Sequence, residues 1–138
     1  MRRRVVYLAA VVFSLVPIIV TSCGGDNTMN LIFNQGTSSC ATVNLSSAVI
    51  QCNGGVFSFN GSVITSDPCN YLKAEVELSD EPRIVIEIKA VSSLGQEDYC
   101  VECLGEIPFD GTLEVSDACS NTLSIVYNET IIAEYECR

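Results

Sequence analysis

Cys100-Val-Glu-Cys103 is the spacing in this sequence with the most potential for chemistry. A C-x-x-C pair is redox-active where a helix N-terminus lowers a thiol pKa, and it forms half of a structural zinc site where a second pair exists. Here the pair falls in a predicted strand without a surrounding βαβ pattern, and Cys69 alone supplies no second pair. We therefore expect disulfide-bonded cysteines. A thiol redox or metal protein using Cys100 and Cys103 is an alternative function.

The chain contains no histidine, which removes the commonest groups of enzyme active sites. Ser-His-Asp and Cys-His catalysis, histidine-ligated metals and the usual general base near neutral pH all need this residue. Many acids alternate with apolar residues and are expected on a solvated sheet face: Glu75, Glu77, Glu87, Glu134 and Glu136. No D-x-D-x-D-G calcium loop is present. The sequence thus predicts no catalytic residue, no metal site, no cofactor and no enzyme.

Eight cysteines in 138 residues indicate a disulfide framework in an exported protein. A hairpin turning at Asn128-Glu129 places Cys119 opposite residue 137 or 138. Directly opposed residues of antiparallel strands lie about 4.5–5.5 Å apart, within disulfide reach. We therefore expect a Cys119–Cys137 bridge.

The same pairing of residues around a turn predicts a Cys40–Cys52 bridge across a first hairpin. Cys69 begins a central hairpin and Cys100 begins the strand after its return loop, so an up-and-down chain brings these two together. Cys103 points to the opposite face of its strand from Cys100, and is predicted to be the cysteine left over as a free thiol.

The first 22 residues have the pattern of a secretory signal peptide. Arg2–Arg4 are basic, Val5–Val20 are mainly apolar, and small polar residues follow at Thr21-Ser22. A transmembrane anchor is the rival interpretation, but the apolar run is interrupted by Pro17 and is shorter than the roughly 20 residues of a span.

Val20-Thr21-Ser22-Cys23 resembles the lipobox of prokaryotic lipoproteins, with valine in the place usual for leucine. The resemblance implies that Cys23 is lipid-modified and becomes the mature N-terminus, with residues 23–39 as the tether and first loop. The protein would then be anchored to the outer face of a membrane, at the cell surface or in the periplasm. An ordinary signal peptide would instead give a secreted protein, in which Cys23 is free to reach Cys103.

Removal of residues 1–22 takes away three of the seven basic residues and none of the 17 acids, which leaves a net charge of −13. Such a surface repels nucleic acid and anionic lipid headgroups, so no nucleic-acid partner is expected. Sequons occur at Asn44, Asn60 and Asn128. Three are close to the number expected by chance, so they do not by themselves predict glycosylation.

Period-two alternation is the main structural signal. It predicts a central hairpin, with one apolar face formed by Leu72, Ala74, Val76 and Leu78 and by Ile84, Ile86, Ile88 and Ala90. Strands recur every 8–12 residues or so, which predicts a single antiparallel β-sandwich over residues 40–138. The expected core residues are Phe57, Leu72, Val76, Ile84, Ile86, Ile88, Leu123 and Ile125.

Other local patterns predict finer features. Pro108–Gly111 has the composition of a turn, Gly61 indicates a bulge, and Ile131, Ala133 and Tyr135 alternate inward. The alternation and the last hairpin, residues 121–136, resemble an immunoglobulin-like domain, although the chain has no tryptophan. That resemblance implies a sandwich and no particular function.

These observations favour a non-catalytic, lipid-anchored β-sandwich that binds or scaffolds an extracellular protein or glycan. The second class of function is a secreted inhibitor or ligand-sequestering protein that acts through exposed loops. The third is the thiol redox or metal protein already named.

Overall fold

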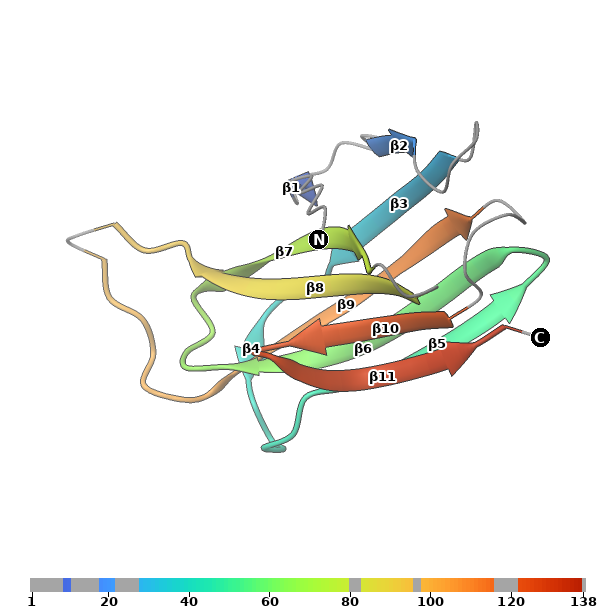
Figure 1. The fold of residues 1–138 in the computed structure, drawn as a ribbon. Coiled ribbons are helices and arrows are strands. Elements are labelled where there is room, and N and C mark those ends of the chain that lie inside the picture. The colour runs from blue at the N-terminus through green and yellow to red at the C-terminus, as the bar shows by residue number, and fades with distance from the viewer. Residues whose placement is uncertain are drawn as a thin grey trace.

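The computed structural model describes residues 9–10, 18–21, 28–79, 83–95, 98–115 and 122–137, and these form only strands and loops (Figure 1). None of them belongs to a helix that could cross a membrane. Most of the predicted signal peptide, Cys23 and Cys119 lie outside the described residues. The strands are β1 Ala9–Ala10, β2 Ile18–Thr21, β3 Thr28–Gln35, β4 Ser39–Cys40, β5 Ser47–Asn53, β6 Val56–Thr65, β7 Asn70–Leu78, β8 Arg83–Ser92, β9 Gly105–Val115, β10 Thr122–Tyr127 and β11 Thr130–Glu136.

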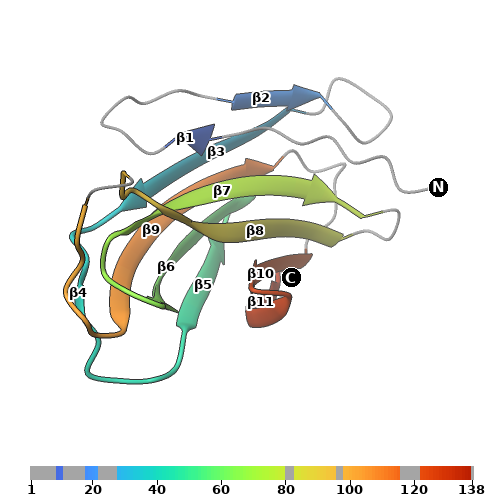
Figure 2. The same ribbon diagram turned by 90° about the vertical axis from the view of Figure 1, so that its left-hand side faces the viewer.

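Two sheets pack face to face, as the predicted β-sandwich requires (Figures 1 and 2). One sheet has the order β1-β7-β8-β10-β11, and the other has the order β2-β3-β9-β6-β5, with β4 also paired to β9. The first sheet is mixed rather than antiparallel, because β8 and β10 run parallel. After β8 the chain crosses to the other sheet, returns along β9 and enters β10 in its original direction. The immunoglobulin-like topology stays a prediction.

The central hairpin forms as the alternation predicts. β7 and β8 pair antiparallel with Leu72 opposite Ala90, Val76 opposite Ile86 and Leu78 opposite Ile84. Side chains two residues apart share a sheet face, so this register puts the apolar set of both strands on the inner face.

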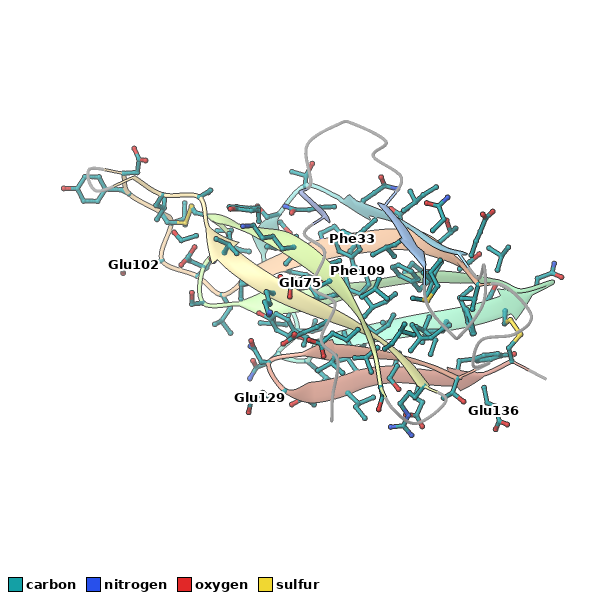
Figure 3. The ribbon with its side chains drawn as sticks, turned by 45° about the horizontal axis from the view of Figure 1, so that its top comes forward. Phe33, Glu75, Glu102, Phe109, Glu129 and Glu136 are labelled. Carbon is teal, nitrogen blue, oxygen red and sulfur yellow. A yellow bond between two sulfur atoms is a disulfide. The ribbon has the colours of Figure 1, made fainter. Side chains whose placement is uncertain are left out.

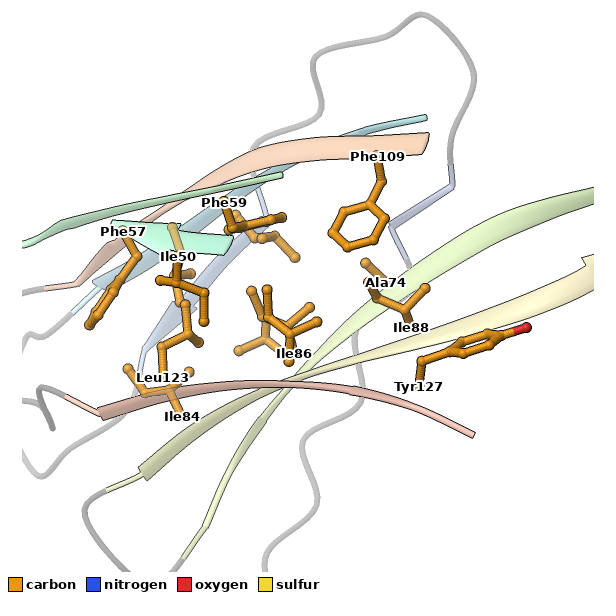
Figure 4. Close-up of a cluster of buried hydrophobic side chains, with 14 of the residues drawn as sticks. Ile50, Phe57, Phe59, Ala74, Ile84, Ile86, Ile88, Phe109, Leu123 and Tyr127 are labelled. Atoms are coloured by element: carbon orange, nitrogen blue, oxygen red, sulfur yellow. The ribbon is translucent and has the colours of Figure 1, made fainter. Parts of the chain in front are cut away.

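The core fills the space between the two sheets (Figure 4). All eight residues predicted for it are buried. The sheet of β3, β9, β6 and β5 supplies further buried side chains that are absent from the predicted core: Met29, Leu31, Ile50, Phe59, Val63, Ile107, Phe109 and Leu113. Since Met29 and Leu31 belong to β3, the packed domain includes residues 28–35, which the sequence analysis had assigned to the tether and first loop.

The predicted turn at Pro108–Gly111 is wrong, because these residues lie within the continuous strand β9. Proline lacks an N–H and is normally excluded from interior strands. On one side of β9 the pairing passes at this point from β3 to β4, and Gly36 donates its N–H to the Pro108 carbonyl at 2.8 Å. The missing N–H of Pro108 therefore falls in the gap between two ladders. A side chain at Gly111 would collide with the Ile32 carbonyl and the Phe59 ring.

Two other local predictions need correction. β6 pairs with β9 without a bulge at Gly61; the glycine instead allows close approach to Ser47 and Ala48 on β5. The bulge lies in β11, where the register to β10 shifts between Ile125 and Val126. This shift places Ile131 opposite Val126 on the outer face, whereas Ile132 and Ala133 pack on the core. Tyr135 keeps its predicted position opposite the buried Leu123, but on this edge strand it stays 40% exposed.

Truncation of a core side chain tests the packing. Ile86 is fully buried, so Ile86→Ala is expected to lower the free energy of unfolding by about 2–5 kcal/mol in chemical denaturation. The matched control is Val85→Ala, a neighbouring residue that is half-buried on the other face of β8. Equal losses from the two variants would contradict the assigned inner face.

Candidate binding surface

The Cys69–Cys100 bridge is present as predicted, with the two Cα atoms 6.0 Å apart. It ties the chain just before β7 to the segment between β8 and β9. Ser93 donates both its N–H and its hydroxyl to the Cys69 carbonyl, at 2.9 and 2.7 Å. The start of this return segment is therefore held by a covalent bond and by hydrogen bonds to the same residue.

The predicted Cys40–Cys52 pair and the predicted free thiol at Cys103 are both wrong, because Cys40 is bonded to Cys103. The first hairpin does not form: β4 pairs with β9, which places Cys40 opposite Gly105, and the chain then loops away to β5. Ala41 continues the ladder by donating its N–H to the Leu104 carbonyl at 2.7 Å.

The predicted Cys119–Cys137 bridge is also wrong, because Cys137 is bonded to Cys52. β5 and β11 are the edge strands of the two sheets on the same side of the sandwich, so this bridge joins one sheet to the other. Among the described residues no cysteine is free. Three disulfides are typical of proteins from an oxidising, extracellular environment.

Two of the three bridges lie at one end of the sandwich, here named the loop pole, which is the left-hand end of the ribbon in Figure 1. It consists of segments 36–46, 66–69 and 93–104, with 96–97 not described, together with the Asn128-Glu129 turn. The opposite end, the N-terminal pole, contains the start of β3 and the end of β9, where Met29 pairs with Val115. The Cys52–Cys137 bridge lies at the N-terminal pole, near the β5–β6 turn.

Hydrogen bonds fix the remaining segments of the loop pole. The Asp67 carboxylate accepts bonds from the Cys69 N–H at 2.9 Å and the Asn70 amide at 3.0 Å. The Ser38 hydroxyl donates to the Pro68 carbonyl at 2.6 Å, and Ser46 accepts from a backbone N–H of β6 at 2.9 Å. These bonds and the two bridges connect the described segments of the pole to one another and to the sheets.

Tyr127 closes the space beneath the loop pole. Its ring is buried and its hydroxyl donates to the Ile64 carbonyl at 3.0 Å, which links β10 of one sheet to β6 of the other. Burial raises the pKa of Tyr127 above its ordinary value, and a hydrogen bond with the Asn128 side chain partly offsets this. The phenol therefore keeps its proton, and with it this cross-sheet bond, beyond the pH at which a solvated tyrosine ionises.

Large apolar side chains are exposed on the loop pole rather than buried beneath it. Tyr99 has 98% of its surface exposed, Leu45 73% and Val101 67%. With Val43 and Leu104, these make five of the eight exposed large apolar residues among the described parts of the chain. Exposed apolar side chains concentrated at one end of the molecule mark that end as a candidate binding site.

The charge of the loop pole is of one sign. Its segments contain no lysine or arginine. Asp98 accepts a hydrogen bond from the Gly95 N–H at 2.6 Å, whereas Glu102 and Glu129 are exposed and have no partner among the described residues. Figure 3 shows these two glutamates toward the loop pole and Glu136 toward the opposite end.

The basic residues that the structure describes lie on the sheet of β7 and β8 and are engaged there. Lys89 Nζ is 2.8 Å from Glu75 Oε2 and 3.2 Å from Glu87 Oε2, and the hydrogen bond to Glu75 is the main reason that the pKa of Lys89 is raised. Glu75 is buried, so its assignment to the solvated face is wrong. Arg83 lies 3.6 Å from Glu134. Lys73 lies 5.6 Å from the centre of the Tyr71 ring.

One cluster at the loop pole has the composition of a metal site. Asp67, Cys69 and Cys100 place a carboxylate oxygen and two sulfurs within 4.8 Å of one another. The two sulfurs are bonded to each other, so they are not thiolates, and the Asp67 carboxylate already accepts three hydrogen bonds. The arrangement serves to hold the loop.

The sequence analysis found Cys69 and Cys100 but missed the apolar surface next to them. Sequence alone does not signal it, because Ala41, Val43 and Leu45 alternate with polar residues as they would in a half-buried strand. All three sequon asparagines are exposed, with Asn44 and Asn128 at the loop pole.

Comparison of the chain with protein-family models, with curated proteins and with solved structures finds no match.

Peptide mapping of the unreduced protein tests the framework. It is expected to recover Cys40–Cys103, Cys52–Cys137 and Cys69–Cys100. Replacing Cys40 and Cys103 together with serine is expected to lower the free energy of unfolding by about 4 kcal/mol, because the bridge closes a long loop. Recovery of a Cys40–Cys52 peptide would contradict the pairing of β4 with β9.

Proposed function

We propose that this chain is a non-catalytic, lipid-anchored β-sandwich on the outer face of a membrane that binds an extracellular partner through its loop pole. The observation that carries the proposal is the exposed apolar surface built on two disulfide-held segments. A free monomer gains nothing from exposing Tyr99 and Leu45 to water, whereas a binding partner would bury them.

The path of the chain supports the anchored arrangement. β3 is the first strand after Cys23; it begins at Thr28 and runs from the N-terminal pole to the loop pole. The short strands β1 and β2 precede Cys23 and would be removed with the signal peptide. Eight residues of strand span about 26 Å at about 3.3 Å per residue. A lipid on Cys23 would therefore attach the protein by one end and direct the loop pole away from the membrane.

A secreted inhibitor or ligand-sequestering protein using the same loop pole is the second candidate. The three bridges use six of the eight cysteines, which leaves Cys23 and Cys119. In the sequence, Cys23 precedes β3 by five residues and Cys119 follows β9 by four, and the start of β3 pairs with the end of β9. This favours a fourth bridge in a protein without lipid. A redox role for Cys100 and Cys103 is disfavoured, because each is bonded to a different partner.

The anchor is tested by mass spectrometry and thiol alkylation of the native, unreduced protein. Lipidation predicts that the mature chain begins at Cys23 with a diacylglycerol adduct, and that Cys119 is the residue that alkylates. A Cys23–Cys119 peptide and no alkylated thiol would replace the anchored form with the secreted one.

Binding at the loop pole is tested by photo-crosslinking on the native surface. A benzophenone amino acid in place of Tyr99 is expected to form a specific adduct, because this side chain is exposed at the proposed contact. The control carries the same group in place of Glu114, which is exposed on β9 at the N-terminal pole. The absence of an adduct at position 99, or equal adducts at both positions, would refute binding through this pole.

A further inference from the structure

We propose that the partner of the loop pole is a cationic protein or peptide surface in which lysine or arginine surrounds apolar side chains. This inference rests on the proposed binding function and specifies the chemistry of its partner. It follows from three properties of the pole: its exposed apolar groups, its unpaired carboxylates, and the disulfides that hold the segments carrying most of them.

The apolar part of the contact lies on the two segments that the Cys40–Cys103 bridge joins. The ladder between Ala41 and Leu104 holds these segments side by side, with Val43 and Leu45 on one and Val101 and Leu104 on the other. Tyr99 precedes Cys100, which is bonded back to Cys69. The apolar groups are thus presented on backbone that loses little freedom on binding.

The carboxylates of the pole determine the sign of the charge that a partner should carry. Glu102 lies between Val101 and Cys103 on the same segment, and Glu129 extends from the neighbouring hairpin turn; both are exposed and without a cation among the described residues. No lysine or arginine occurs in any segment of the pole. A partner bearing lysine or arginine around its apolar contacts would supply the missing counter-charges.

The same charges argue against other macromolecules. The mature net charge of −13 repels nucleic acid and anionic membranes, and it accelerates encounters with cationic proteins. A neutral glycan would stack on Tyr99 but would leave the aliphatic groups of the pole, such as Leu45 and Val101, without apolar contact.

Panning a library of random peptides against the mature protein tests the inference. Enriched peptides are expected to contain more lysine and arginine than acidic residues, together with aliphatic or aromatic residues. Their affinity is expected to fall several-fold when salt is raised from about 0.1 M to about 1 M, because the Debye length shortens from about 10 Å to about 3 Å.

Matched variants locate the contact. Tyr99→Ser is expected to weaken the binding of a selected peptide by about tenfold or more, as the loss of a central aromatic contact does. Glu102→Gln is expected to weaken it several-fold and to reduce its salt dependence. Glu136→Gln, an exposed glutamate at the N-terminal pole (Figure 3), is expected to have no effect. These side chains are exposed, so unchanged disulfide maps will show that the fold is retained.

The outcomes separate the two proposals. Acidic or uncharged peptides, or a neutral glycan, that lose affinity with Tyr99→Ser would overturn the cationic partner and leave binding at the pole intact. Peptides whose affinity does not change with Tyr99→Ser, or a library that yields no enriched peptide, would overturn both the cationic partner and binding at the loop pole.

Discussion

The face-to-face burial of two apolar sheet surfaces is the interaction on which the rest of this structure depends. Phe57 and Phe59 on β6 pack toward Ile84 and Ile86 on β8, and few polar side chains intrude between them (Figure 4). Each sheet has an apolar inner face that the other sheet covers, so neither is expected to remain folded alone. The bridge between Cys52 and Cys137 holds the two sheets together at one edge.

Local alternation was enough to predict the central hairpin and its core residues. Ile84, Ile86 and Ile88 follow one another at period two, and their partner strand does the same, so register and inner face follow from the sequence. β9 could not be predicted in this way. Its Pro108 is tolerated only because the pairing passes there from β3 to β4, and its Gly111 is required by a neighbouring ring. Both causes lie in strands distant in sequence.

The candidate site was predicted only in part, for the same reason. The Cys69–Cys100 bridge encloses a local hairpin and its return segment, whereas Cys40–Cys103 depends on β4 adding to β9 and joins cysteines 63 residues apart. Once that pairing is known, the exposed groups beside it can be located. The predictions of Cys40–Cys52 and Cys119–Cys137 bridges failed because they assumed that cysteines close in sequence flank the same hairpin turn.

The distance in sequence between the bonded cysteines also bears on how the disulfides form. Of the three described bridges, only Cys69–Cys100 joins cysteines that are consecutive in the sequence; the others span 63 and 85 residues. Loop-closure entropy makes short loops the first to form when an unfolded chain is oxidised, so early oxidation gives non-native pairs such as Cys40 with Cys52. These must be exchanged by thiolate attack before the sheets can close. We therefore expect maturation of this small sandwich to include disulfide isomerisation, and its yield to depend on the isomerase activity of the compartment in which it folds.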